Sequence, residues 1–118
     1  MLDAEITAQL VELEQDDNEG LVEKLVSILR EKAPQIFAEI ERGIAAGEAE
    51  RIKAAVHSFR SSCSNLGASV SAAICEEMES HANKNNLSAV PALYQRLMEA
   101  YPLDEQDLIA LAASVAKK

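Results

Sequence analysis

Residues 51–75, R-I-K-A-A-V-H-S-F-R-S-S-C-S-N-L-G-A-S-V-S-A-A-I-C, decide the fold of this chain. At about 100° per residue, one side of a helix collects the apolar residues Ile52, Val56, Phe59, Cys63, Leu66, Val70 and Ile74. The other side collects the polar residues Lys53, His57, Arg60, Ser61, Ser64 and Ser71. An apolar stripe must pack on other helices. The stretch therefore predicts a bundle helix whose His57 faces solvent.

The same stretch contains no Asp or Glu, although the chain has 20 acidic against 11 basic residues and a net charge of −9. Its cations are Arg51, Lys53 and Arg60, and the last two lie within one turn of His57 on the same face. Such a histidine is suited to carry a phosphoryl group, because the product is an anion that nearby positive charge stabilises. From spacing alone, an ordinary surface histidine between two cations is an equal alternative.

The run 55–68, A-V-H-S-F-R-S-S-C-S-N-L-G-A, resembles the signature of histidine-containing phosphotransfer (HPt) domains, which is approximately H-x-L-K-G-x-S-x-x-L-G-A. His57 falls on the phosphorylated histidine of that family, Arg60 on its usual lysine, and Phe59 on the apolar position before the lysine. The resemblance covers about residues 10–101. It includes Leu66-Gly67-Ala68 in the motif, the helix start Gly47-Glu48, Cys75 and Met78-Glu79 in the next helix, and the turn Asn85-Asn86-Leu87.

Three positions depart from the family pattern. Arg60 keeps the positive charge of the common lysine but replaces its compact ammonium group by a planar guanidinium. Ser61 replaces a glycine that leaves room for the partner, and Cys63 replaces a serine but points into the predicted bundle. The histidine and its neighbouring cation are both retained. The departures therefore bear on transfer rate and partner preference.

The resemblance implies a phosphoryl carrier that exchanges phosphate with a response-regulator receiver domain and with a histidine kinase or hybrid kinase. His57 would be the acceptor, Arg60 and Lys53 would stabilise the transferred oxygens, and Glu79 would orient the ring by accepting its Nδ1 hydrogen. The motif and docking residues would be Phe59, Ser61, Ser64 and Gly67. Because the chain has no nucleotide-binding loop and no Asp cluster for magnesium, it is not expected to be an enzyme with its own ATP site or to need a cofactor.

Helical spacing predicts helices over about residues 3–14, 19–46, 48–66, 69–83, 88–101 and 104–116. We expect Asn18 to cap the second helix, Gly47 to end it and Gly67 to mark a turn. Pro34 should kink or break the second helix, and Pro102 should break or bend the chain. The prediction is an all-α, antiparallel up-down four-helix bundle with an N-terminal capping helix and a C-terminal helical extension. One domain would span residues 1–118, with its bundle core over about residues 19–101.

Composition excludes several classes of protein. The net charge of −9 argues against nucleic-acid binding, which depends on neutralising phosphates. No apolar run approaches the ~20 residues of a membrane span, and the N-terminus lacks the features of a signal peptide. We therefore expect a cytoplasmic protein that does not bind membranes, and we expect it to be a monomer.

A metal site is not expected either. Cys63 and Cys75 fall on predicted apolar faces and are expected to be free, buried thiols. Cysteine and histidine pairs here lie six residues apart, which turns their side chains away from each other on a helix, whereas metal ligands on a helix need spacings of three or four. His81 has no motif around it and is expected to be a surface histidine.

Two alternatives to phosphotransfer remain open at this point. The first is a helical-bundle adaptor that keeps the fold and binds a signalling partner without being phosphorylated. The second is the dimerisation domain of a sensor kinase. Those domains typically follow their histidine with Glu and soon afterwards Thr-Pro, whereas His57 is followed by Ser58-Phe59-Arg60-Ser61, and the next proline after it is Pro91. The sequence therefore favours the phosphoryl carrier over this second alternative.

Overall fold

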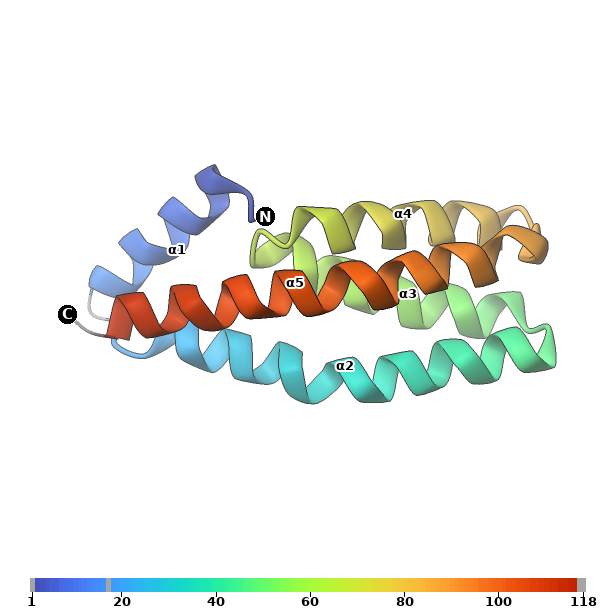
Figure 1. The fold of residues 1–118 in the computed structure, drawn as a ribbon, viewed down its shortest axis with the longest axis horizontal. Helices are drawn as coiled ribbons and strands as arrows, with labels where there is room; N and C mark the ends of the chain where they lie inside the picture. The colour runs from blue at the N-terminus through green and yellow to red at the C-terminus, as the bar shows by residue number, and fades with distance from the viewer. Residues whose placement is uncertain (1, 17, 117–118) are drawn as a thin grey trace.

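The computed structural model describes residues 2–16 and 18–116, and within these ranges it contains helices and no strands. The helices are α1 (Ala4–Gln15), α2 (Leu21–Ala46), α3 (Ala49–Asn65), α4 (Ser69–Asn83) and α5 (Val90–Ala116), with a 3₁₀ turn at Leu87–Ala89. Helices α2 to α5 run antiparallel to their neighbours in the chain, and α1 lies across one end of them (Figure 1). The predicted all-α bundle with an N-terminal capping helix is confirmed.

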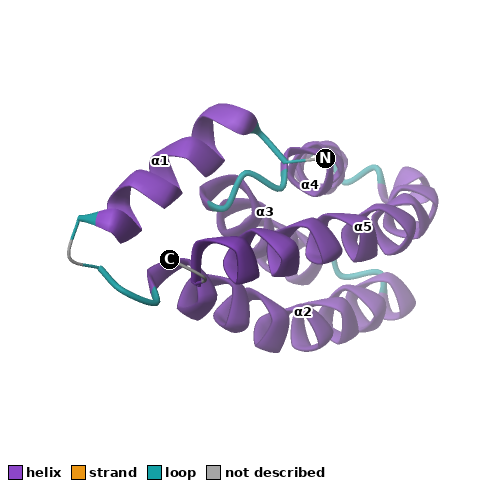
Figure 2. Ribbon diagram, turned by 60° about the vertical axis from the view of Figure 1, so that its left-hand side comes forward, coloured by secondary structure: helices purple, strands orange, loops and turns teal. Residues whose placement is uncertain are grey.

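The bundle closes on itself because α3 packs against α2 and α4, and α5 packs against α4 and α2. Figure 2 shows these four helices seen obliquely, with α1 set apart from them at one end. The molecule is elongated, with principal extents of 48 × 22 × 21 Å. Among the helices of residues 2–16 and 18–116, even the long α2 and α5 are too polar to cross a membrane.

Two prolines lie inside helices and do not interrupt them. Pro34 lies within α2, which curves along its length in Figure 1, and Pro102 lies within α5. The prediction of a break at Pro102 was wrong, because buried residues on both sides of it, including Tyr101 and Leu108, hold one continuous helix against the core. This packing offsets the ~3 kcal/mol that an interior proline costs. The C-terminal residues therefore extend the last bundle helix, and buried Val115 takes the core beyond the predicted end at residue 101.

The turn between α1 and α2 differs from the prediction for Asn18. The residue that precedes α2 is Gly20, which has a φ of 80°. The N–H of Val22, in the first turn of α2 where N–H groups have no partner within the helix, donates to Glu14 Oε1 at 2.8 Å. The Asn18 side chain instead donates to the Leu13 carbonyl at 2.8 Å. Asn18 thus closes the end of α1, and a carboxylate from α1 takes the capping role at α2.

Two residues of α4 exchange the roles that the sequence predicted for them. Val70 was expected in the apolar stripe and is 46% exposed, whereas Ser71 was expected at the surface and is fully buried. The prediction failed because α3 ends before the Gly67 turn and α4 starts anew after it. A helical wheel drawn through that turn loses its phase. The buried Ser71 donates from its N–H and its hydroxyl to Asp104 Oδ2, at 3.1 and 2.7 Å.

An aromatic cluster fixes the middle of α3. The ring of Phe59 meets those of Phe37 on α2 and Tyr101 on α5 edge to face, each with centroids 5.2 Å apart. Phe37 and Tyr101 also meet each other, at 5.5 Å. Phe59 is completely buried. Because interlocked aromatic rings restrict movement and rotation, this cluster gives the opposite, outward face of α3 a rigid base.

Candidate functional site

His57 lies near the middle of α3 and points away from the core. Its neighbours Val56 and Phe59 are completely buried, which turns His57 to the other side of the helix. The imidazole side chain is 56% exposed. The prediction that His57 faces solvent is therefore confirmed, and the ring is accessible to a partner molecule.

Glu79 brings a carboxylate from α4 to this histidine. Its Oε2 atom lies 2.7 Å from His57 Nδ1, and its Oε1 atom accepts a hydrogen bond from Arg60 Nε at 2.9 Å. The Glu79 side chain is only 16% exposed. Burial of Cys75 and Met78 against the core sets Glu79 on the edge of α4 that faces α3. One carboxylate thus bridges the histidine and the arginine.

The hydrogen bonds of His57 determine which of its nitrogens is free. Arg60 Nη2 lies 3.3 Å from His57 Nδ1, and a guanidinium can only donate. Nδ1 can accept from Arg60 or donate to Glu79, but it cannot do both. The contact with Glu79 is shorter and involves a carboxylate, so we assign the hydrogen to Nδ1. Nε2 then carries the lone pair, and no residue in the described part of the chain forms a hydrogen bond with it.

The three cations of the acid-free stretch have different surroundings. Arg60, one third exposed, contacts His57 and Glu79 directly. Lys53 is half-buried one turn before His57, and within residues 2–16 and 18–116 it has no ion pair or hydrogen bond. Arg51 pairs instead with Glu39 and Glu48. Its hydrogen bond holds the pKa of Glu39 below its usual range. Arg51 is therefore engaged elsewhere, and Arg60 and Lys53 are the cations nearest to the histidine in sequence.

The four predicted motif and docking residues separate into two groups. Ser61 and Ser64 are exposed. Phe59 and Gly67 are buried, so of these four residues the structure places only the two serines at the surface. Phe59 belongs to the aromatic cluster. Gly67, at a φ of 80°, lies under the start of α1, where its carbonyl accepts from Asp3 N–H at 2.7 Å.

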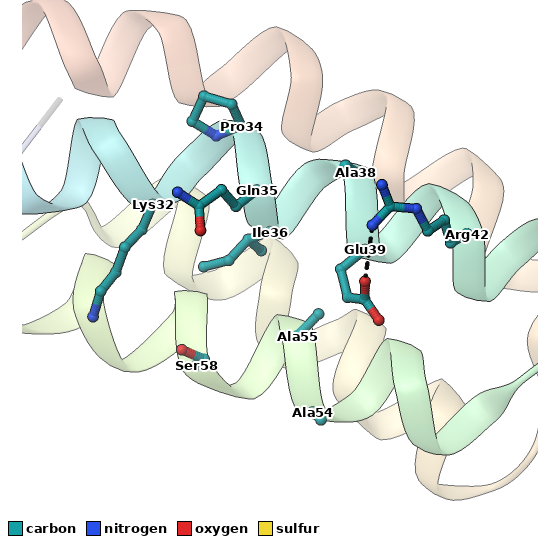
Figure 3. A pocket seen from close by; sticks show the side chains of 10 residues that line it. All are labelled: Lys32, Pro34, Gln35, Ile36, Ala38, Glu39, Arg42, Ala54, Ala55 and Ser58. Carbon is teal, nitrogen blue, oxygen red and sulfur yellow. Dashed lines mark hydrogen bonds and ion pairs between the residues drawn. The ribbon is translucent and has the colours of Figure 1, made fainter.

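A groove between α2 and α3 lies beside the histidine, and the sequence did not reveal it. It encloses about 870 Å³, and its α3 wall includes Ser58, the residue that follows His57. Figure 3 shows the Lys32 side chain extending from α2 toward α3 near Ser58. Its lining residues are Lys32, Pro34, Gln35, Ile36, Ala38, Glu39, Arg42, Ala54, Ala55 and Ser58. The motif lies on α3 and the turn that follows it, so it carried no signal for the α2 side of this groove.

The remaining nucleophiles do not form a second site. Cys63 and Cys75 are free and completely buried. Burial raises the pKa of the Cys75 thiol to about 12 and that of Cys63 even further, so neither is a thiolate at neutral pH. His81 lies near the end of α4, with Nδ1 3.1 Å from the Asn86 amide nitrogen. In the described ranges, no three His, Cys, Asp or Glu residues lie together in a way that could hold a metal ion.

Comparison with known proteins defines the class of protein to which this fold and site belong. The family model described as the Hpt domain matches residues 24–114, which is most of the chain. The chain therefore belongs to the Hpt domain family, and this membership supports a histidine phosphotransfer role in two-component systems. Domains of this family are phosphoryl carriers rather than enzymes with an ATP site.

A solved structure agrees with this assignment. The chain is similar to histidine-containing phosphotransfer protein B (HptB) from Pseudomonas aeruginosa PAO1, in a crystal structure with a TM-score of 0.79 and 25% sequence identity. The match covers 96% of this chain and 95% of that one. A search of curated proteins finds no match.

Proposed function

We propose that His57 carries a phosphoryl group between a histidine kinase, or the receiver domain of a hybrid kinase, and the aspartate of a response regulator. One observation carries the proposal above all. The exposed His57 has its Nδ1 atom held at 2.7 Å by Glu79 and its Nε2 atom open to solvent. This residue also occupies the position of the phosphorylated histidine in the family signature.

The residues of the site have distinct roles in this transfer. Glu79 holds the ring in one tautomer, so that Nε2 presents its lone pair to the incoming phosphorus atom. The phosphoryl group then passes in line through a loose transition state, where positioning and charge stabilisation provide most of the catalysis. Arg60 directs its free guanidinium nitrogens toward the transferred oxygens while Glu79 holds its Nε atom. Lys53 adds a second positive charge.

The partner supplies what the chain lacks. The sequence has no phosphate-binding loop, so the phosphoryl group comes from a kinase or a receiver domain, together with any magnesium ion the reaction requires. Ser61 and Ser64, both exposed, lie on the side of α3 that such a partner would approach. We also infer that the protein acts in the cytoplasm as a monomer.

Phosphotransfer from a phosphorylated receiver domain or a hybrid kinase tests the proposal. The wild type is compared with His57→Gln and with His81→Gln, which is a matched control because His81 is the only other histidine. We expect label that is stable to alkali and labile to acid on the wild type and on His81→Gln, and none on His57→Gln.

Two other results would contradict the proposal. Label on none of the three proteins across several donors, with folding intact by circular dichroism, would indicate an adaptor that binds its partner without phosphorylation. Label that persists on His57→Gln and disappears from His81→Gln would place the phosphoryl group on the other histidine.

A further inference from the structure

The group that orients His57 is a carboxylate, whereas a neutral amide oxygen would be enough to orient the ring. We propose that the negative charge of Glu79 keeps the Nδ1 proton on His57 throughout the phosphoryl cycle. Phosphorylated His57 is then an imidazolium, and the phosphoryl group enters and leaves without uptake or release of a proton. This inference rests on the proposed function and adds to it the protonation state of the carrier.

The two half-reactions balance without moving a proton. In the first, the Nε2 lone pair attacks phosphorus, a P–N bond forms, and the P–O bond to the donor aspartate breaks with its electron pair going to that aspartate. The ring keeps its Nδ1 hydrogen and gains one positive charge. In the second, an oxygen of the acceptor aspartate attacks phosphorus and the P–N bond breaks. Its electron pair returns to Nε2, and the ring is again neutral with hydrogen on Nδ1.

The geometry around Glu79 suits this role. Glu79 Oε2 lies 2.7 Å from Nδ1, and the side chain is only 16% exposed, so water screens its charge incompletely. The other oxygen is bonded to Arg60 Nε at 2.9 Å, which stops the carboxylate from rotating away from the ring. Before phosphorylation, Arg60 balances the charge of Glu79. After phosphorylation, the guanidinium can also contact the phosphoryl oxygens, and Glu79 balances the imidazolium.

The other charged groups near the ring do not supply this stabilisation. On α3, Lys53 and Arg60 are both cations and oppose a positive ring. On α4, Glu76 lies one turn before Glu79 and has no hydrogen bond to His57. On α2, Lys32 extends toward α3 near Ser58 and is also a cation (Figure 3). Glu79 is therefore the anion in contact with Nδ1.

The protonation state determines how readily the phosphoryl group leaves. From an imidazolium the leaving group is a neutral imidazole, whereas from a ring without the Nδ1 hydrogen it is an imidazolate, which is a much poorer leaving group. A carrier that keeps this hydrogen transfers its phosphoryl group equally well across the alkaline range. Without the charge of Glu79, the ring would lose the hydrogen as the pH rises, and transfer would slow.

The matched variants are Glu79→Gln, which keeps an oxygen acceptor but removes the charge, and Glu76→Gln, which removes a charge one turn away. Each protein is phosphorylated with phosphoramidate, a small donor that needs no partner, and release of the phosphoryl group is followed by phosphorus NMR from about pH 7 to 9.5. We expect release from the wild type and from Glu76→Gln to change little over this range. We expect release from Glu79→Gln to slow by up to about tenfold per pH unit in its upper part. Circular dichroism verifies that each variant is folded.

Nitrogen NMR of the phosphorylated wild type provides a second readout that depends on no variant, and we expect the ring to keep its Nδ1 hydrogen over the same range. Loss of that hydrogen, or the same pH profile for Glu79→Gln and the wild type, would overturn this inference while leaving the phosphoryl carrier intact. If the wild type accepts no more phosphoryl group than His57→Gln, from phosphoramidate and from receiver domains alike, the proposed function fails and this inference fails with it.

Discussion

The start of α4 buries Ser71 and exposes Val70, which is the reverse of what the apolar stripe predicts, and substitutions at these two positions test this packing directly. In Ser71→Ala, Asp104 loses the hydroxyl donor at 2.7 Å and keeps the Ser71 backbone N–H at 3.1 Å, inside a buried site. A hydrogen bond to a charged group contributes about 1.5–3 kcal/mol, so we expect the free energy of unfolding to fall by that amount. At roughly 4 °C per kcal/mol for a domain of this size, the Tm falls by about 6–12 °C.

Urea unfolding and thermal melts, both followed by circular dichroism, measure this change. Val70→Ala is the matched control, because Val70 is 46% exposed and its truncation should change the free energy of unfolding by less than about 0.5–1 kcal/mol. A single continuous helical wheel through residues 51–75 predicts the reverse order, with Val70→Ala the costlier substitution. If Ser71→Ala is neutral and Val70→Ala is strongly destabilising, the restart of the helix after Gly67 and the bond to Asp104 are both wrong.

Three further predictions concern the support of the site. Phe59→Ala should lower the free energy of unfolding by about 3–5 kcal/mol in urea titrations, because it empties the aromatic cluster. Arg51 lowers the pKa of Glu39 in the folded protein below its value in the unfolded chain, which is near 4.5. The ion pair therefore stabilises the fold fully when the pH is above the unfolded-state pKa, and this stabilisation is lost as the pH falls through the folded-state pKa. Glu39→Gln should therefore lose less stability than the wild type between neutral pH and about pH 3. Cys63 and Cys75 should react with a thiol reagent only after unfolding, since both are buried and protonated, and rapid labelling of the folded protein would contradict this.

The sequence predicted the parts of this structure that depend on local pattern. The apolar stripe of α3 predicted which side chains face the core, from Ile52 to Cys63. The exposure of His57 followed from the same periodicity. Its contact with Glu79 was expected only through the family resemblance, because spacing within one helix says nothing about which residue of the next helix comes opposite. The structure brings the two together at 2.7 Å.

Other features depend on information that no local pattern holds. The 3.6-residue spacing of one helix does not predict which face of the next helix is buried once a turn separates them. The apolar stripe of α3 therefore could not be continued through Gly67 to Val70 and Ser71. The effect of Pro102 depends on whether the residues on both sides are buried, and that is decided by the whole bundle. The groove beside His57 combines α2 with α3, and Lys32 has no signature in its own segment. In each case the missing information is which distant segment packs against a residue.

The unbroken path of α5 through Pro102 has a consequence for dissecting the chain. A fragment that stops at residue 101 would discard Asp104, the acceptor that holds the start of α4, together with the buried Leu108, Ala112 and Val115. The apolar side chains of α2 that pack against that part of α5 would then be exposed to solvent, and exposed apolar patches of this kind promote self-association. The residues beyond Pro102 thus belong to the same packed core as the rest of the bundle, and an added tag or fused partner is best joined after α5 ends at Ala116.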